Sequence, residues 1–339
     1  MSTVFYSIQN TAAGSCALVC NIGGALRELS VPDKNGIPRD VLLGFANPDD
    51  YAVNPYSFGA LVGRYANRLR DGRFPLDGRI IQVDRNNPYR DCLHGGYPRF
   101  GLTPMRLVAH NGNSLTMGLT SPDGAGGFPG TVELRLTYTL TDDGALRIEY
   151  RAVTDQATVI NLTNHAYFNL EGIESRSIAD HYVTIDSERI LEVEGGARVI
   201  PTGNFLPVEG TALDLRKEKR MGDVLDPALM PEALRPTGGY DFNYATAPDL
   251  SRAAASVFAP KSGIRLTVYS TEPALGYYTA NCLDGKYPGK CGSGYPPHSG
   301  LCLESQHFPD SPNHPGFPST VLRPDEEYRQ TTIWQFSHE

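Results

Sequence analysis

Strict two-residue alternation of apolar and polar side chains is the feature that most constrains the fold of this chain. In residues 132–140 the apolar positions are Val132, Leu134, Leu136, Tyr138 and Leu140. Charged and hydroxyl side chains occupy the positions between them. Side chains point to opposite faces of a β-strand in turn, so this period predicts a strand with one buried face.

Turn residues separate the alternating segments. Asp142-Asp143-Gly144 divides the first segment from a second alternating run at residues 145–152. Asp77-Gly78 and Asn35-Gly36 give the same signal elsewhere in the chain. Glycine accepts the positive φ that such a turn needs, so each site predicts a β-hairpin.

Helical periodicity is weak by comparison. Its best window covers residues 214–234, where Pro227, Pro231 and Pro236 interrupt it because proline removes a backbone donor. Residues 264–268 add another alternating strand. Strands bounded by turn residues along most of the chain are typical of a sandwich rather than of βαβ units. We therefore expect an all-β protein.

Composition narrows the possible partners. The chain has 339 residues, 40% of them hydrophobic, and a formal net charge of −8 with no run of basic residues. An acidic chain repels phosphate backbones, so we expect no nucleic acid partner. A membrane span would need about 18 consecutive apolar residues, which the sequence lacks. The first residues also lack the basic and apolar regions of a secretory signal, so we expect a cytoplasmic protein.

Metal and cofactor motifs do not occur in the sequence. The six cysteines lack the paired CxxC spacing of a structural zinc site, and we expect small buried or half-buried thiols in a reducing compartment. His307 and His314 have no HxH or HExxH pattern and no carboxylate triad beside them. The glycine-rich nucleotide motifs and the GxSxG of hydrolases are also missing.

The segment Asn161–Leu170 (NLTNHAYFNL) is the most informative for chemistry. Read as a strand, its apolar residues share one face, and Asn161, Thr163, His165 and Tyr167 share the other. A histidine flanked by hydrogen-bonding groups near an apolar core is a candidate acid or base, although a lone histidine is more often structural.

Two glycine-containing segments are further candidates. The segment Gly63–Arg68 (GRYANR) could fix a polyhydroxylated or anionic ligand, or its arginines could lie on the surface. In Leu93–Gly96 (LHGG) the glycines permit backbone to approach a ligand closely, or form an ordinary turn.

A carboxylate follows at the end of a predicted strand. Leu301 and Leu303 point one way, so Glu304 points the other way with Cys302, just before a proline-rich loop. That position suits the rim or floor of a pocket. The irregular stretch at residues 286–300 is either a functional loop or a solvated connection.

The chain resembles the aldose 1-epimerases, the galactose mutarotases, over nearly its whole length. The motifs that carry the resemblance, in the family's order, are GRYANR (Gly63–Arg68), LHGG (Leu93–Gly96), NLTNHAYFNL (Asn161–Leu170), PTG (Pro201–Gly203), GYD (Gly239–Asp241) and ESQ (Glu304–Gln306). The resemblance implies one large antiparallel β-sandwich domain over residues 1–339, called a supersandwich, with the sugar in a cleft on one sheet. It implies no cofactor and no metal.

The same resemblance implies a role for each motif residue in interconverting the α and β anomers of a free aldohexose such as galactose or glucose. Glu304 would be the base at the C1 hydroxyl, and His165 the acid at the ring oxygen. His94 would assist at the ring oxygen, and Arg68 would hydrogen-bond the developing charge. Asn67 and Asp241 would orient the sugar hydroxyls. We expect a monomer or homodimer.

Three other functions remain open at this stage. A glycoside hydrolase needs two carboxylates, which Asp241 and Glu304 could supply. A non-catalytic sugar-binding module could use the same fold, although this chain keeps a candidate acid and a candidate base. An epimerase for phosphorylated hexoses fits the acidic charge and the two arginines of Gly63–Arg68 less well.

The chain departs from the family's pattern at two places. Gly276 stands where the family often has a glutamine, and no tryptophan follows Leu93–Gly96. The first departure leaves the preferred sugar open. It also leaves room for a larger substituent, for Tyr277, or for a side chain of the loop at 286–300.

Overall fold

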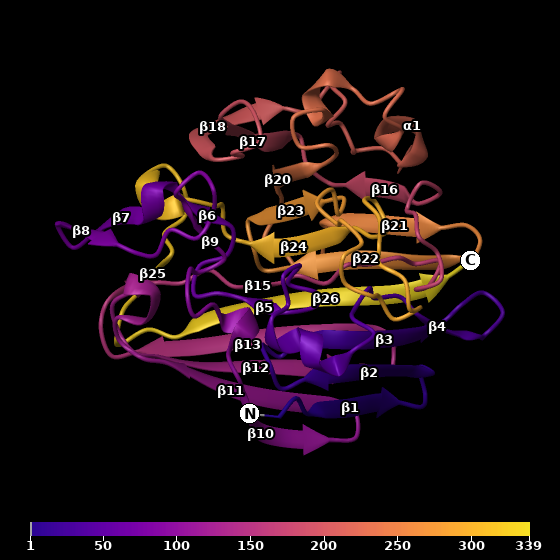
Figure 1. The fold of residues 1–339 in the computed structure, drawn as a ribbon, viewed down its shortest axis with the longest axis horizontal. Helices are drawn as coiled ribbons and strands as arrows, with labels where there is room; N and C mark the ends of the chain where they lie inside the picture. The colour runs from indigo at the N-terminus through magenta and orange to yellow at the C-terminus, as the bar shows by residue number, and fades with distance from the viewer. Residues whose placement is uncertain (1) are drawn as a thin grey trace.

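A nine-stranded antiparallel sheet forms the back layer of the computed structural model, which describes residues 2–339 (Figure 1). Its strands, in spatial order, are β10 (Arg106–Asn111), β11 (Ser114–Ser121), β12 (Val132–Leu140), β13 (Ala145–Thr154), β26 (Tyr328–His338), β22 (Ile264–Ser270), β21 (Ala255–Ala259), β16 (Tyr182–Ile185) and β19 (Lys219–Arg220).

Two smaller sheets pack on one face of the nine-stranded sheet. One is four-stranded, with β1 (Phe5–Asn10), β2 (Ser15–Cys20), β3 (Leu26–Pro32) and β4 (Pro38–Asp40) in sequence order. The other is five-stranded, in the order β18 (Pro201–Pro207), β17 (Arg189–Val193), β20 (Asp241–Ala245), β23 (Ala274–Tyr278) and β24 (Cys302–Gln306).

One apolar core lies between these layers. Leu134 and Trp334 of the large sheet share it with Val19 of β2 and Leu303 of β24. Burial of apolar side chains between facing sheets is the main stabilising contribution in a sandwich. The expected all-β antiparallel sandwich is confirmed.

Short strand pairs and helical turns complete the fold. The pairs are β5 (Leu61–Val62) with β15 (Thr163–Asn164), β6 (Arg68–Leu69) with β9 (Cys92–Leu93), β7 (Arg73–Leu76) with β8 (Arg79–Gln82), and β14 (Thr158–Val159) with β25 (Val321–Leu322). The α-helix is α1 (Gly222–Leu225), and the 3₁₀ helices are Pro48–Ala52, Arg70–Gly72, Phe100–Leu102, Ala125–Gly127, Glu232–Leu234 and Ser311–Asn313. Among residues 2–339, no helix is both long and apolar enough to cross a membrane.

The predicted hairpins are confirmed. β12 and β13 pair from Val132 opposite Thr154 to Leu140 opposite Leu146, around the Asp142–Gly144 turn. Residues 35–36 lie between β3 and β4, and residues 77–78 lie between β7 and β8. Alternate residues of β12 are buried, because one face of this strand packs on the core.

The prediction of a regular strand over Asn161–Leu170 is wrong. Only Thr163–Asn164 is strand, and all ten residues are buried. The segment runs between the layers and makes single bridges, such as those from Phe168 to Leu42 and Leu301. Leu162 and Phe168 do join the core. Because neighbours enclose the segment on both sides, it has no solvent face that a two-residue period could mark.

Candidate active site

Three strands of the five-stranded sheet build one wall of a cleft. Across β20, β23 and β24, Asp241 lies opposite Tyr278, and Gly276 lies opposite Glu304. Because side chains alternate along a strand, Asp241, Tyr278 and Glu304 share one face. Tyr277 lies on the other face and packs in the core. We call this the sheet wall.

Two residues of the opposite wall, Asn67 and His94, flank the short strand pair β6–β9. The backbone N–H of Asn67 donates to Nδ1 of His94 at 3.3 Å, and the N–H of His94 donates to the carbonyl of Asn67 at 2.9 Å. Both residues have positive φ, 61° and 52°. A backbone N–H is only a donor, so Nδ1 of His94 is unprotonated and the proton of the neutral ring is on Nε2.

His165 joins the same wall from the segment between the layers. Its backbone N–H donates to the carbonyl of Ala60 at 3.0 Å, and its ring stacks on Tyr167 with centroids 5.0 Å apart. Nδ1 lies 3.5 Å from Sγ of Cys302, and Nε2 lies 3.8 Å from Oε1 of Glu304. Asn67, His94 and His165 form what we call the loop wall.

The cleft between the two walls encloses about 220 Å³. All six predicted site residues line it, together with Arg99, Tyr56, Tyr167 and Tyr278. The six are Asn67, Arg68, His94, His165, Asp241 and Glu304. Residues 63–68, 93–96, 161–170, 239–241 and 304–306, which are far apart in sequence, therefore meet at one place.

The sheet wall holds its carboxyl groups in an environment that favours the neutral form. Burial, then repulsion from Asp241, raises the pKa of Glu304 to about 8, although Arg68 partly offsets the shift. Burial also raises the pKa of Asp241, and the positive charge of Arg68 opposes the rise. Nη2 of Arg68 lies 3.7 Å from Oδ2 of Asp241. Both shifts follow from the cost of placing a charge away from water.

The loop wall has the opposite electrostatics. Burial lowers the pKa of His165 to about 4, and the charge of Arg99 adds to the effect. Burial, followed by the charges of His165, Arg68 and Arg99, lowers the pKa of His94 well below its usual range. Burial therefore favours the neutral form of both imidazoles at pH 7.

Glu304 has one oxygen with no protein partner. Among residues 2–339, no donor lies within hydrogen-bond distance of its buried Oε2. A buried carboxylate oxygen without a donor is costly, and the hydroxyl of a bound molecule can supply one. The cleft is thus suited to a ligand rich in hydroxyl groups.

Arg64 does not line the cleft. It neither faces a ligand nor lies on the surface, so both interpretations of the Gly63–Arg68 arginines are wrong for this residue. Its side chain is 2% exposed, and Nη1 donates to the carbonyls of Pro129 and Gly130 at 2.8 and 2.9 Å. Nη2 donates to Oγ of Ser121 at 2.7 Å. The guanidinium therefore ties the end of β11 to the segment at residues 129–130, and of the two arginines only Arg68 lines the cleft.

The space beside Gly276 is filled by a residue that the sequence did not suggest. A Cβ at Gly276 would lie 3.0 Å from Nε2 of Gln306, and that amide donates to Oδ1 of Asn243 at 2.7 Å. Tyr277 faces the core, where its hydroxyl donates to Met221. The interpretation that Tyr277 moves toward the cleft is therefore wrong.

The loop at residues 286–300 does not line the cleft. It packs behind the loop wall instead, where Tyr295 contacts Phe58 with ring centroids 5.8 Å apart. Lys290 is held by an ion pair with Asp40. Neither the functional-loop interpretation nor the solvated-connection interpretation describes this packing.

Tyr56 and Tyr278 line the cleft without having been predicted from the sequence, and so does Arg99. It follows Leu93–Gly96 by three residues, so its position after the glycine turn was the available signal. Cys302, which the sequence places on the same strand face as Glu304, lies beside His165.

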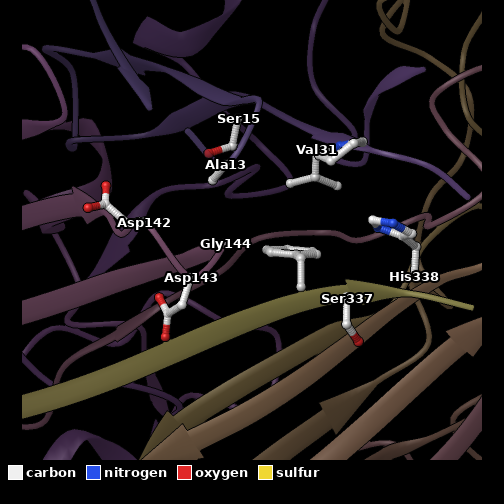
Figure 2. A pocket seen from close by; sticks show the side chains of 10 residues that line it. Ala13, Ser15, Val31, Asp142, Asp143, Gly144, Ser337 and His338 are labelled. Carbon is white, nitrogen blue, oxygen red and sulfur yellow. The ribbon is translucent and has the colours of Figure 1, made fainter. Parts of the chain in front are cut away.

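A second pocket, of about 330 Å³, lies between the Asp142–Gly144 turn and the end of β26. Asp142 and Asp143 lie at one end of it and His338 at the other (Figure 2). Asp143 accepts a hydrogen bond from Thr141 and Asp142 from Asn10, so their carboxylates serve the turn itself. This pocket is larger than the cleft, but it does not place an acid and a base close together. The candidate active site is therefore the cleft.

His307 and His314 have carboxylate partners rather than metal-ligand sets. Nδ1 of His307 lies 2.5 Å from Oε2 of Glu272, and Nε2 of His314 lies 3.2 Å from Oδ2 of Asp310. Within residues 2–339, no group of three or more His, Cys, Asp or Glu residues is arranged to hold a metal ion.

Comparison with known proteins identifies the family. The family model described as aldose 1-epimerase matches residues 5–335. The chain belongs to the aldose 1-epimerase family. A galactose mutarotase of Mus musculus is 43% identical over 93% of this chain and 89% of its own length. An aldose 1-epimerase of Escherichia coli is 36% identical over 96% of this chain and 92% of its own.

Solved structures agree with the aldose 1-epimerase assignment. The GalM/aldose epimerase homologue of C. elegans has a TM-score of 0.91 and 30% identity, with 99% of each chain covered. A galactose 1-epimerase of Lactobacillus acidophilus has a TM-score of 0.85 and 26% identity, covering 100% of this chain and 95% of that one. The expected isomerase of this family, acting in the mutarotation of aldoses, is confirmed, and the glycoside hydrolase and binding-module alternatives are not favoured.

Proposed function

We propose that the cleft interconverts the α and β anomers of free aldohexoses such as galactose or glucose, with Glu304 and His165 as its base and acid. The observation that carries the proposal is the 3.8 Å separation between Oε1 of Glu304 and Nε2 of His165 inside one buried cleft. Mutarotation needs a base at the C1 hydroxyl and an acid at the ring oxygen. The hydroxyl oxygen and the ring oxygen are both bonded to C1, so the two groups must lie close together. One carboxylate and one imidazole at this separation can serve both.

The steps balance without a cofactor. Glu304 takes the proton of the C1 hydroxyl, the C1–O5 bond breaks, and O5 takes a proton from Nε2 of His165. The aldehyde then rotates about C1–C2, and the reverse transfers close the ring with the other configuration. Each positioned proton transfer contributes about 10²–10⁴ in rate.

The titration of the pair defines which form is active. The pKa of Glu304 is about 8 and that of His165 is about 4. From about pH 4 to pH 8 the two groups together therefore hold one titratable proton. The reaction needs that proton on His165, with Glu304 ionised. This is the less populated of the two arrangements of the singly protonated pair. A bound sugar whose hydroxyls donate to ionised Glu304 favours this arrangement, because hydrogen bonding stabilises the charged carboxylate.

We assign Asn67, Arg68 and Asp241 to binding, and His94 to catalytic assistance at the ring oxygen. Nη1 of Arg68 donates to Oδ1 of Asn67 at 3.1 Å, which holds both side chains against the cleft. Asp241, partly exposed, accepts from sugar hydroxyls. Nε2–H of His94 donates at the ring-oxygen side, since Nδ1 already accepts from Asn67.

Polarimetry on freshly dissolved α-D-glucose and α-D-galactose tests the proposal. We expect the rotation to reach its equilibrium value faster than in buffer, in proportion to enzyme concentration. Incubation with an aryl glycoside should release no phenol, whereas a hydrolase using Asp241 and Glu304 would release it. Failure to accelerate either sugar would contradict the proposal.

We further propose a reducing, cytoplasmic location. All six cysteines are free, which is usual where glutathione keeps thiols reduced. The expectation of buried or half-buried thiols is wrong for Cys282 and Cys291, which are exposed. The single domain over residues 1–339 and the monomeric or homodimeric state remain predictions. Light scattering would settle the state.

A further inference from the structure

Arg99 brings a positive charge into the cleft without a carboxylate to neutralise it. Its side chain lines the cleft beside His94 and His165. Nη2 donates to the carbonyl of Asn54 at 3.4 Å, a long hydrogen bond, and within residues 2–339 the guanidinium makes no ion pair. Arg68, by contrast, is held by Asp241 and Asn67.

Within residues 2–339, most N–H donors of the Arg99 guanidinium have no protein partner and are open to a ligand. It carries five N–H donors in a planar fork, and one long bond to a carbonyl uses a single donor. Burial lowers the pKa of Arg99, and no carboxylate opposes that shift. An anionic group brought into the cleft would therefore gain a charge-assisted, bidentate partner.

The charge of Arg99 lies on the loop-wall side of the cleft. It is among the causes that lower the pKa of His94 and of His165. The pKa values of Asp241 and Glu304 respond to Arg68 instead. Arg68 also lowers the pKa of His94, so its charge acts on both walls, whereas that of Arg99 acts on the histidines. The geometry agrees, because Arg99 bonds Asn54, and the carbonyl of Tyr56, two residues further on, accepts from the hydroxyl of Tyr167, the ring that stacks on His165.

Sugar chemistry determines which substituent reaches the histidine end. With Glu304 at the C1 hydroxyl and His165 at the ring oxygen, the next ring atom beyond O5 is C5. C5 carries C6, so the C6 group projects past the histidines, toward Arg99. The other hydroxyl carbons of the ring lead away from O5.

We propose that the enzyme prefers aldoses with a carboxylate at C6, the hexuronates, and that Arg99 binds this carboxylate. The inference rests on the proposed function, because it uses the orientation fixed by Glu304 and His165. A carboxylate matches one guanidinium in charge and in its two-oxygen geometry. A C6 phosphate would bring close to two negative charges against this one unpaired arginine.

The experiment compares substrates by anomer exchange in NMR spectra at pH 7.5, with the spontaneous rate subtracted. The substrates are D-glucose, D-galactose, D-glucuronate, D-galacturonate and D-glucose 6-phosphate. We expect kcat/KM for at least one hexuronate to exceed that for its parent hexose by about tenfold or more, as a charge-assisted bond allows. Added salt should lower the hexuronate value and leave the hexose value nearly unchanged.

Arg99→Gln is the decisive variant. We expect the ratio of kcat/KM for hexuronate to kcat/KM for hexose to fall about tenfold or more relative to wild type. The ratio is used because Arg99 also acts on both histidines, and that effect is common to all substrates. Arg79→Gln, an exposed change outside the cleft, removes the same charge and should keep the wild-type ratio.

Each outcome decides between the two proposals. A hexuronate-to-hexose ratio that Arg99→Gln leaves within threefold of wild type overturns the role of Arg99. A stronger Arg99-dependent preference for D-glucose 6-phosphate overturns the carboxylate class. Enzyme-dependent exchange of glucose without exchange of any hexuronate overturns this inference and leaves the proposed function intact. No exchange of any of the five sugars contradicts the proposed function itself.

Discussion

The two walls of the cleft are built differently and hold protons in opposite ways. The sheet wall takes Asp241 and Glu304 from paired strands in regular register. The loop wall takes Asn67 and His94 from positive-φ positions. Burial raises the carboxyl pKa values on the first wall and lowers the imidazole pKa values on the second.

The contrast shows how one buried cleft yields both an acid and a base. Desolvation disfavours the charged form of every group, so a carboxyl group retains its proton and an imidazole loses one. The pair of Glu304 and His165 therefore holds a single proton over a wide pH range. A symmetric reaction, which must run in both directions, is well served by two groups that exchange one proton through the substrate.

Glu304→Gln should have the largest effect on activity, because it removes an ionisable group of the sheet wall. The amide keeps the shape and removes the proton acceptor from the sheet wall. We expect kcat for galactose and glucose to fall at least about a hundredfold, the lower end of the contribution of general base catalysis. Glu188→Gln, an exposed change outside the cleft, is the matched control. A polarimetric rate within threefold of wild type would rule out Glu304 as the base.

His165→Asn should remove the acid and leave the base in place. We expect kcat to fall at least about a hundredfold while KM changes less, because the interaction belongs to the transition state. With only Glu304 left, residual activity should rise with pH through about 8. His94→Asn should be milder or comparable. A pure increase in KM for His165→Asn would reassign His165 to binding.

The stability of Glu304→Gln tests the sheet wall independently of activity. Folding raises the pKa of Glu304 from 4.5 to about 8, so the folded state binds the proton more tightly. That stabilisation is complete below pH 4.5 and is lost as pH rises through about 8. We expect the variant to match wild type near pH 4.5 and to gain about 2 °C or more in Tm at pH 8.5. An equal Tm difference at both pH values would contradict the raised pKa.

Gly276→Gln should have the smallest effect. Its Cβ would displace the amide of Gln306 by a few tenths of an ångström, and its own amide would extend along the sheet wall. We expect KM to fall about two- to tenfold for at least one hexose, the value of one hydrogen bond, with kcat within threefold. Gly276→Ala should keep the wild-type KM. Equal KM values for all three proteins would show that this position does not reach the sugar.

The sheet wall was largely predictable from sequence, whereas the loop wall was not. Two-residue alternation predicted the strands, and the position of Leu301 and Leu303 predicted which way Glu304 faces. His165 and His94 were recognised through motifs, but their segments depend on contacts far along the chain. The N–H of His165, for example, is held by Ala60, and no local period encodes that bond.

Arg64 and Arg99 show the same limit. The sequence places both near glycines, and nothing local separates them. Arg64 meets backbone carbonyls of residues 129–130 and is sequestered, whereas Arg99 makes one long bond to Asn54 and stays at the cleft. Which arginine serves the ligand is decided by the surrounding loops, whose packing is a tertiary property.

The pH dependence of kcat/KM for wild type tests the shared-proton account most directly. Anomer exchange of glucose would be measured from pH 4.5 to 9.5, with the spontaneous rate subtracted. The account predicts a plateau between about 5 and 7.5, because the pair of Glu304 and His165 keeps one proton there. Above about 8 the pair loses that proton and kcat/KM falls about tenfold per pH unit. A value that instead rises through pH 8 would contradict the account, since it would show that Glu304 works without an acid.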